Sequence, residues 1–577
     1  MSLLLGIFYF LVLVGILIFI HEGGHFLAAK LFKVKVEVFS IGMGPRIFGF
    51  MKGDTDYRIS AVPIGGYVRM LGEDPTAEVD ESEGSVAAMA PWKRIVIYAA
   101  GPAANLLFPF GLYFFLALGQ STVPPAEIGA VLDNSPAERA GLRTGDRVVA
   151  IDGAAIYSFN HMVEVIQRHP GRAIVLTVER DGRTLQVPVV PAPKHGPKYD
   201  LPMLRHLRDV KGQIGILGIY PDTIVGVDAD SVAARAGLRT FDRVEAVDGQ
   251  PVERLFDLEK ALLSAGGREV SLTVSRLKGK LPDAAFPDAK TAASLPLDRQ
   301  PDLFDKAPLT IRLSVPSSAA DLNAVGLHHS LGHVMNVTPG GPAERAGLRR
   351  GDRLMAVDGR PLSAFEIMSK VFDVAPDGKD TVRRILTVER DGARMDISYK
   401  ADWVSAGTRR DLGLEDDLID PGFHVRPWSA EWVGKAPVPV ANPAPVAYAA
   451  RMSVSQTLFW SGIILDVLGA VVQGHVSPKS MSGPLGIGQA AAQVGAEGPS
   501  AFFGFMGFVS LNLGLLNLLL PIPILDGGRL LLITTEVVTR RRLSRQVQER
   551  ILLVGAVMVL ALMVWAVIMD IARIYLG

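Results

Sequence analysis

The stretch Ile16–Phe32, ILIFIHEGGHFLAAKLF, places His21, Glu22 and His25 where a long apolar run ends. The run Leu3–Ile20 carries no charged residue and is long enough to cross about 30 Å of hydrocarbon as a helix. His21 and His25 are four residues apart, so on a helix they share one face. Ionisable side chains at membrane depth cost on the order of 3 kcal/mol each, so their presence here indicates a function.

The letters HEGGH fit the pattern H-E-x-x-H, in which two imidazoles bind zinc and the glutamate polarises a water molecule. The chain has no cysteine, which excludes disulfides, thiolate zinc ligands and a cysteine nucleophile. The alternative is a pair of merely polar histidines at a helix end. The pattern favours a metal site built from His, Asp or Glu.

A catalytic zinc ion usually takes three protein ligands and one open position, so a third ligand is needed. The candidate is Asp526, in the stretch NLLLPIPILDGGR that begins at Asn517. Two prolines precede Asp526 and two glycines follow it, and broken backbone at membrane depth is tolerated where it lines a polar cavity. The alternative is an ordinary aspartate in a turn at a helix end.

Three further apolar runs are long enough to cross a bilayer: Ile95–Leu118, Ala501–Leu525 and Ile551–Met569. A fifth stretch, Ser455–Val472, carries Asp466 and is predicted to lie in the membrane interface. The first run lacks the basic start and the cleavage site of a signal peptide. The sequence therefore predicts a polytopic α-helical membrane protein with about four transmembrane helices.

Lysine and arginine crowd the loop after the first run and the loop between the last two runs. Short loops rich in these residues stay in the cytoplasm, so both termini and the segment from about 120 to 450 are expected on the other side. Lys+Arg and Asp+Glu number 59 each, so the global charge gives no argument for a nucleic-acid partner.

The long segment contains three copies of one phrase, at Ser135–Gly153, Ser231–Gly249 and Gly341–Gly359. Recurrence at domain-sized intervals predicts tandem modules. Each copy indicates a short helix, a turn, a strand that ends in a DG turn, and a further helix near residues 161–168, 255–263 or 365–372. The middle copy departs most, because Val232 replaces Pro136 and Phe241 replaces Gly145.

These phrases resemble PDZ domains of the bacterial protease type. The resemblance implies a small β-rich module whose groove accepts a peptide end by strand addition. A structural spacer with an unused groove is the alternative. We expect α+β or β-rich PDZ-like modules over residues 125–195, 210–300 and 325–400, and a linker over 401–450. Residues 1–120 and 451–577 would then form the membrane part.

Together, HEGGH and NLLLPIPILDGG resemble the site-2 protease family of intramembrane zinc metalloproteases, and most closely its bacterial regulator-of-sigma-E type. The stretch GPAAN at Gly101 agrees with this resemblance. The stretches SIGMGP at Ser40 and YRISAVPIGGYVRMLGE at Tyr57 are similar to the family's membrane-associated β-hairpin. One or two PDZ domains are usual in this group, and here there are three.

The resemblance implies one Zn²⁺ on His21, His25 and Asp526, with Glu22 as the catalytic base. Asn517 would bond the substrate backbone, and the hairpin around Gly65 and Gly66 would pair with a substrate helix as it unwinds. The implied substrates are transmembrane segments of single-pass proteins, such as a trimmed anti-sigma factor or a remnant signal peptide, cut by regulated intramembrane proteolysis. The implied location is the bacterial inner membrane, with the active site towards the cytoplasm and the PDZ-like modules outside.

Two other functions remain open from the sequence. One is a catalytically inactive, membrane-anchored PDZ scaffold that binds peptide C-termini, against which an intact HExxH and LDGG argue. The other is a metal transporter, which would favour further buried ligands, but the apolar stretches offer little beyond Asp466, Asp570 and Asn105. The substrate, the module that binds a peptide or gates entry, and the oligomeric state are not indicated.

Overall fold

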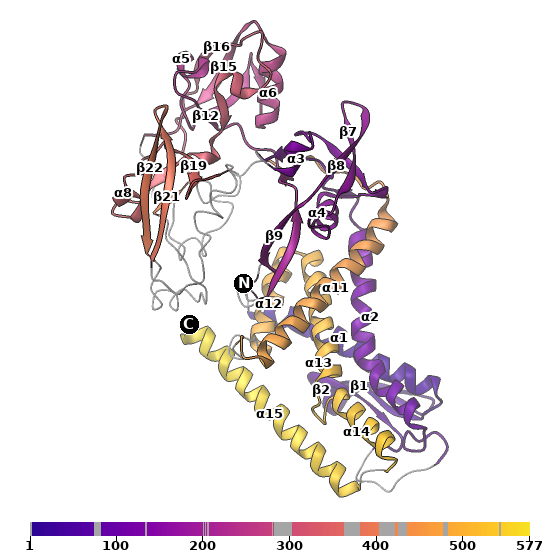
Figure 1. Cartoon of the computed structure of the whole chain (residues 1–577). Coiled ribbons are helices and arrows are strands. Elements are labelled where there is room, and N and C mark those ends of the chain that lie inside the picture. The colour runs from indigo at the N-terminus through magenta and orange to yellow at the C-terminus, as the bar shows by residue number, and fades with distance from the viewer. Residues whose placement is uncertain are drawn as a thin grey trace. The chain divides into compact units, whose positions relative to one another are not determined.

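The computed structural model describes residues 3–73, 82–132, 135–199, 201, 204, 207–279, 281, 303–362, 381–402, 422–424, 435–476, 483–541 and 544–576 (Figure 1). The chain forms two compact units. The membrane unit contains Met1–Ser121, Tyr199–His206 and Asn442–Gly577, and the repeat unit contains Thr122–Lys198 and Leu207–Ala441.

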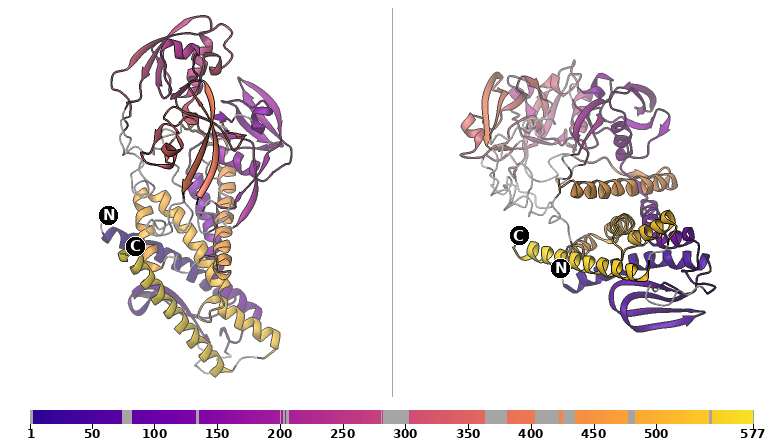
Figure 2. Two further views of the ribbon diagram at one scale, coloured as in Figure 1. Left: turned by 60° about the vertical axis from the view of Figure 1, so that its left-hand side comes forward. Right: turned by 60° about the horizontal axis from the view of Figure 1, so that its bottom comes forward.

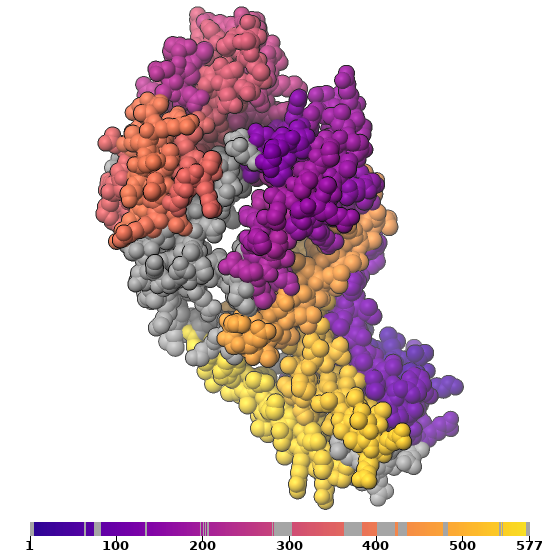
Figure 3. All heavy atoms as spheres, in the orientation of Figure 1, coloured from indigo at the N-terminus to yellow at the C-terminus, as the bar shows by residue number. Residues whose placement is uncertain are grey.

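The membrane unit is built from long apolar helices. Five of them are long and apolar enough to cross a membrane. They are α1 (Leu3–Leu31), α2 (Pro91–Leu118), α11 (Pro445–Val472), α13 (Pro499–Leu519) and α15 (Arg545–Leu576), joined by the shorter α12 (Pro484–Glu497) and α14 (Asp526–Thr539). Exposed apolar side chains cover α15, including Leu553, Val554 and Val557, and this helix forms part of the outer surface in the space-filling view (Figure 3). Such a surface suits contact with lipid.

Helix α11 is longer than the interfacial helix predicted over Ser455–Val472. It begins at Pro445 and has 28 residues, so it also meets the length and composition of a span. Arg451 precedes the predicted stretch, and this one charged residue does not end the helix. Ser453 Oγ donates to the main-chain oxygen of Phe110 at 2.6 Å, which fixes α11 against α2.

Buried polar and small residues hold the helices of the membrane unit together. The side chain of Asp570, 1% exposed in α15, accepts hydrogen bonds from the main-chain N–H groups of Gly483 and Gly486 at 2.9 Å each. A carboxylate is stabilised at the N-terminus of a helix, so Asp570 caps α12. A Cβ built on Gly24 of α1 would lie 2.3 Å from the main-chain oxygen of Ala100 in α2. Glycine therefore permits the close approach of these two helices.

The predicted β-hairpin is a small sheet made of two long, bent strands, β1 (Val36–Lys52) and β2 (Thr55–Met70) (Figure 2). Residues 36–41 pair with both 66–70 and 56–59, and residues 46–52 pair with 55–60. The two strands thus give four antiparallel segments, because β1 turns at Gly42 and Gly44, where φ is +87° at both. Its exposed apolar side chains suit contact with lipid and include Ile47, Phe48, Phe50 and Met51.

The repeat unit contains three similar modules, which we call repeats 1, 2 and 3. Each has a four-stranded antiparallel sheet, in the orders β6-β5-β7-β8, β14-β13-β15-β16 and β20-β19-β21-β22. Repeat 1 contains β4 (Ala130–Val131), α3 (Pro136–Arg139), β5 (Arg147–Ile151), β6 (Ala154–Ala155), α4 (Phe159–Gln167), β7 (Ile174–Arg180), β8 (Arg183–Val189) and β11 (Ile216–Leu217). Repeat 2 contains β12 (Val225–Val227), α5 (Val232–Ala236), β13 (Arg243–Val247), β14 (Gln250–Pro251), α6 (Leu255–Ser264), β15 (Glu269–Ser275), β16 (Leu309–Ser314), η3 (Leu322–Val325) and β17 (Leu327–His329).

Repeat 3 contains η4 (Ser330–Gly332), β18 (Asn336–Val337), α8 (Pro342–Ala346), β19 (Arg353–Val357), β20 (Arg360–Pro361), β21 (Thr381–Arg390), β22 (Ala393–Asp402) and β23 (Phe423–His424). The helix predicted near residues 365–372 lies outside the described residues. Two further pairs are β3 (Thr122–Val123) with β24 (Val440–Ala441), and β9 (Ala192–Pro197) with β10 (Arg208–Gln213).

In each repeat the first strand pairs with the last: β4 with β11, β12 with β17 and β18 with β23. These pairs extend the repeats to residues 217, 329 and 424, beyond the ends predicted at 195, 300 and 400. The closing strands have only two or three residues, so they carry too little alternation to be recognised in the sequence. Repeat 2 therefore includes β17, which the predicted boundaries assign to the third module.

One buried ion pair recurs in all three repeats. In repeat 1 the guanidinium of Arg180 donates to both carboxylate oxygens of Asp146, at 2.6 and 2.7 Å, and to the main-chain oxygen of Gly141 at 2.8 Å. The equivalent pairs are Arg276 with Asp242 and Arg390 with Asp352. The Asp146 side chain is 0% exposed, so the arginine supplies the charge that its burial requires.

Phe241 explains the departure of the middle copy. It has φ +75°, the conformation that glycine adopts at the equivalent positions 145 and 351, yet its side chain is only 2% exposed. It packs in a small core with Ile224, Leu277, Leu303 and Met335, which come from repeats 2 and 3. This small core therefore joins the two repeats, and burial of the ring offsets the backbone strain.

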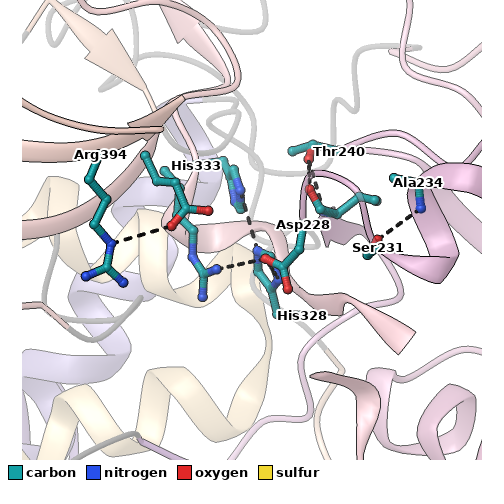
Figure 4. Close-up of polar contacts among 10 residues, drawn as sticks. Asp228, Ser231, Ala234, Thr240, His328, His333 and Arg394 are labelled. Carbon is teal, nitrogen blue, oxygen red and sulfur yellow. Dashed lines mark hydrogen bonds and ion pairs between the residues drawn. The ribbon is translucent and has the colours of Figure 1, made fainter. Parts of the chain in front are cut away.

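Polar contacts reinforce this junction (Figure 4). The rings of His328 and His333 are stacked, with their Nε2 atoms 3.5 Å apart, and Arg353 Nη1 lies 3.0 Å from Asp228 Oδ1. Burial, with the nearby Arg353 charge, lowers the pKa of both histidines to about 3. The pair is therefore neutral at physiological pH, and one ring donates an N–H to the other.

Replacing Arg180 with methionine should destabilise repeat 1 by about 3–5 kcal/mol, because Asp146 would remain buried without its partner. Urea-dependent proteolysis of the detergent-solubilised protein measures this change as a lower midpoint for cleavage within repeat 1. The matched control is Arg183→Met, which alters an exposed arginine in the neighbouring strand and should leave the midpoint unchanged. Equal midpoints for the two variants would contradict the stabilising role of the ion pair.

Candidate metal centre

Three side chains predicted as metal ligands converge in the membrane unit. His21 and His25 lie one turn apart on α1, and Asp526 is the first residue of α14. Nε2 of His21 lies 3.1 Å from Asp526 Oδ2, and Nε2 of His25 lies 3.4 Å from Asp526 Oδ1. One ligand atom from each residue lies within 4.8 Å of the others. Both histidines are buried, so the cluster is largely shielded from solvent.

The turn between α13 and α14 carries Asp526 back to α1. Helix α13 ends at Leu519, two prolines follow, and the N–H of Leu525 bonds to the main-chain oxygen of Ile522 at 2.8 Å. A Cβ built on Gly527 would lie 2.6 Å from the oxygen of Leu518, and one on Gly528 would lie 2.2 Å from the oxygen of Ile522. Both glycines are thus needed because the chain folds back on itself without space for a side chain.

Helix α2 shapes the site around His25. His25 Nδ1 lies 2.8 Å from the main-chain oxygen of Ile97, so this nitrogen donates and Nε2 is the nitrogen that faces Asp526. A Cβ built on Gly101 would lie 2.2 Å from His25 Nε2. Any larger residue at position 101 would therefore displace the imidazole.

His21 also has a partner on α2. Asn105 Nδ2 lies 3.1 Å from His21 Nδ1, and Asn105 is fully buried. Gly101 and Asn105 are four residues apart, so one face of α2 contacts both histidines. The sequence indicated GPAAN only as a resemblance, although a glycine and an amide spaced four apart in an apolar helix are a recognisable signal.

Glu22 lies beside the histidines on α1 and under the edge of the small sheet. A Cβ built on Gly66 of β2 would lie 3.1 Å from Glu22 Cγ and 2.5 Å from Ile18 Cγ2. The neighbouring Gly65 has φ +78°, a conformation that favours glycine. The structure thus brings Gly66 of this pair next to Glu22, whereas the atoms nearest to a Cβ built on Gly65 belong to Met43.

Asn517 lies in the last turn of α13, beside the turn that carries Asp526. Its main-chain oxygen would lie 2.9 Å from a Cβ built on Gly527. The structure therefore places the backbone of Asn517 next to Gly527, the residue that follows Asp526. A contact between Asn517 and a substrate remains a prediction.

Two ion pairs that the sequence did not indicate hold α14 in place. The guanidinium of Arg529 donates to Glu73, which follows β2, and it lies 5.1 Å from the ring centre of Tyr98. Glu73 also accepts the N–H of Met70 at 3.1 Å. Near the other end of α14, Glu536 accepts from Arg94 at 2.8 Å. The helix that begins with Asp526 is thus fixed to both the sheet and α2.

The donor set fits zinc. Two imidazole nitrogens and a carboxylate are common ligands of catalytic zinc, and three protein ligands leave a position for water. Each histidine has a second partner on its other nitrogen, as metal-binding histidines usually do. Among the described residues, this is the single group of three or more His, Asp or Glu side chains close enough to hold a metal ion together.

Comparisons with known proteins agree with this chemistry. The profile of Peptidase family M50 matches residues 9–562. A protein of Thermotoga maritima named "Putative zinc metalloprotease" is 24% identical over 572 residues, which cover 98% of this chain and 99% of that protein. A Ralstonia nicotianae protein of the same name, RSc1411, is 26% identical over the full length of both chains. A third, from Treponema pallidum, is 34% identical over 280 residues, which cover 46% of this chain and 60% of that protein.

The family match covers the metal cluster, the three repeats and at least part of each of the five long apolar helices. The chain therefore belongs to peptidase family M50, the site-2 protease family of zinc metalloproteases.

Proposed function

We propose that this protein is an intramembrane endopeptidase that cuts the transmembrane segments of single-pass membrane proteins. The observation that carries the proposal is the convergence of His21, His25 and Asp526, with Glu22 beside them, inside a unit of apolar helices. A metalloprotease site in that setting acts on peptide bonds that lie within or next to the bilayer.

His21, His25 and Asp526 would hold one zinc ion. When bound, zinc lowers the pKa of a water molecule towards about 7 and stabilises negative charge on a carbonyl oxygen. The three ligands keep that chemistry beside α2, where Gly101 gives His25 its space. Glu22 is the catalytic residue of the chain itself, because in H-E-x-x-H the glutamate is not a ligand.

Glu22 first takes a proton from the attacking water and then gives a proton to the leaving amine. Glu22 follows His21 directly on α1, which keeps its side chain near the ligands. Gly66 lies beside Glu22, since a Cβ built on Gly66 would lie 3.1 Å from Glu22 Cγ.

A substrate helix hides its peptide bonds, so it must become extended before cleavage. Within the strands that the structure describes, residues 66–70 pair with 36–41 alone and keep one free edge. An unpaired edge accepts an extended segment by strand addition. We propose that this edge, with Gly65 and Gly66 allowing close approach, binds the unwound substrate, and that Asn517 bonds its backbone.

The direction of the helices supports an arrangement with the repeats outside. The C-terminal part of α1 and the residues just after α13 meet at the metal cluster, so both helices cross in the same direction. Helix α2, which lies between α1 and α13 in the sequence, crosses back in the opposite direction. For α13 to cross in the same direction as α1, α11 and α12 together must leave the chain on the side of the membrane where α2 ended. A crossing by α11 would have to be reversed by α12, whose 14 residues reach only about 21 Å. We therefore propose that α11 lies along the membrane surface or re-enters on its own side.

We further propose that the three repeats are PDZ-like and restrict access to the site. None of the described residues of the repeat unit forms a group of three or more His, Asp or Glu side chains that could hold a metal ion. A bulky extracytoplasmic domain on a substrate would clash with the repeats, whereas a substrate shortened by another protease would pass or bind its new end in a groove. The inner membrane of a bacterium is the location that this arrangement requires.

Glu22→Gln should abolish cleavage and leave zinc binding intact, because the amide cannot accept the proton but the three ligands remain. We expect a loss of at least about 10²-fold in the rate of cleavage of a model transmembrane substrate in detergent. Metal analysis should find one zinc per chain. Asp526→Ala is the contrasting variant, and it should lower both zinc content and activity. Cleavage by the Glu22→Gln protein at the normal rate would refute this mechanism.

A cysteine at Thr184, an exposed position in β8, should react with a membrane-impermeant thiol reagent in cells whose outer membrane alone is opened. A cysteine at Arg541, between α14 and α15, should react only after the inner membrane is permeabilised. The labelling is specific because the native chain has no cysteine. The reverse pattern would place the repeats in the cytoplasm.

Removal of residues 125–437, which also takes away the short segment Tyr199–His206 of the membrane unit, should yield a folded, zinc-binding core that cuts substrates the intact protein refuses. The excision joins neighbouring points, since Val123 pairs with Val440 and Thr122 with Ala441, so a short Gly-Ser linker suffices. Cleavage of a substrate with and without its extracytoplasmic domain measures the effect, and the same deletion with Glu22→Gln is the control. A core that binds zinc but cuts neither substrate would show that the repeats deliver substrates instead of excluding them.

A further inference from the structure

A cavity lies where repeats 2 and 3 meet, and three arginines line it. Its volume is about 350 Å³, and its lining consists of residues 239–242, Arg276, Leu277 and Gly279 of repeat 2 and of Arg350 and Gly351 of repeat 3. We propose that this cavity, which we call the arginine pocket, binds a phosphate group, either as the free ion or on a small phosphomonoester. The pocket belongs to the repeat unit, so the proposal is independent of the metal centre.

The charges on the lining of the arginine pocket do not cancel. Asp242 is the one carboxylate among the lining residues, and Arg276 already pairs with it through contacts of 3.0 and 2.8 Å. Arg239 and Arg350 therefore leave the lining with a net charge of +2. Asp305 also acts on Arg276, but it is exposed and does not line the pocket. A phosphate group carries about −1.5 to −2 charges at pH 7, so one such group balances the excess.

Arg350 is the lining charge with the least compensation. Its guanidinium donates to the main-chain oxygens of Lys278 and Gly279, at 3.0 to 3.3 Å, and to no carboxylate among the described residues. The side chain keeps exposed surface, so a ligand can reach it, yet the neighbouring atoms remove enough water to lower its pKa. A partly desolvated cation without a counter-ion is unfavourable, and an anion in the pocket would remove this cost.

The other two arginines also keep N–H donors for a ligand. A guanidinium has five such donors. Arg276 uses Nε and Nη2 for Asp242 and for the main-chain oxygen of Gly237, so its Nη1 group has no partner within the described part of the chain. Arg239 bonds to Asp242 through its main-chain N–H, and its guanidinium makes no hydrogen bond to another described residue. The pocket thus offers donors from three separate segments of the chain.

The shape and origin of these donors suit a phosphate group. The planar fork of a guanidinium matches the oxygens of phosphate and binds them in pairs. The volume lies at the lower end of the range for small-molecule sites, so a small organic part fits beside the phosphate. Because Arg350 comes from repeat 3 and the other two arginines come from repeat 2, a bound phosphate would also link the two repeats.

The repeats themselves supply a conservative variant. The residue equivalent to Arg350 is Thr144 in repeat 1 and Thr240 in repeat 2, so Arg350→Thr gives repeat 3 a residue that the same turn already accepts. We expect phosphate to bind this variant at least about tenfold more weakly, because it loses a charged hydrogen-bond donor. Arg349→Thr is the matched control. It removes the same charge from the neighbouring exposed residue, which does not line the pocket, and should weaken binding less than about threefold.

The experiment is isothermal titration calorimetry of the full-length protein in detergent, at constant ionic strength set with chloride. Inorganic phosphate and glycerol 3-phosphate are the two probes. Tighter binding of glycerol 3-phosphate would assign a phosphomonoester as the ligand, whereas tighter binding of inorganic phosphate would assign the free ion.

The proposal is overturned if neither probe gives saturable binding to the wild-type protein. Equal affinities of the wild type and Arg350→Thr would also overturn it, because the phosphate would then bind elsewhere. Should Arg350→Thr fail to fold, Arg239→Ser removes a charge from the repeat 2 side of the pocket and should show the same loss. Neither result bears on zinc binding or cleavage, which the variants of Glu22 and Asp526 test separately.

Discussion

The contact of two imidazoles and one carboxylate inside an apolar bundle is the constraint on which the membrane unit depends. Each of these groups is costly to bury alone, and together they satisfy one another or hold a cation. The irregular features nearby follow from this contact. The prolines end α13, the glycines of LDGG let the chain fold back over that helix, and Asp526 then starts α14 within 3.4 Å of both histidines.

Helix α2 contributes no proposed ligand, yet it decides how the ligands lie. Gly101 leaves space for one imidazole, Asn105 faces the other, and the carbonyl of Ile97 orients His25. The ion pair of Arg529 with Glu73 links the helix of Asp526 to the sheet that borders Glu22. A change in the position of the sheet would therefore also act on the metal site, because both are attached to α14.

The sequence predicted the features that local chemistry defines. HEGGH and LDGG were recognisable because each combines a spacing with residues that are expensive at membrane depth. The repeats, the short first helix of each, the second helices of repeats 1 and 2, and the family were likewise predictable. Contacts between distant segments were not, since Glu73 and Arg529 are 456 residues apart and neither carries a motif. The strands that close the repeats and the true start of α11 at Pro445 were missed because their own residues give a weak signal.

Phe241 shows how a departure from a repeat can carry structural information. In the sequence, Phe241 in place of the glycine is one of the two changes that make the middle copy depart most from the others. In the structure the ring joins repeats 2 and 3, and the chain passes from β17 through η4 into repeat 3 without a linker. Two modules that share a buried core have less freedom to turn than modules on a flexible tether. In the steric filter that we propose, the third repeat would add its bulk to that of the second.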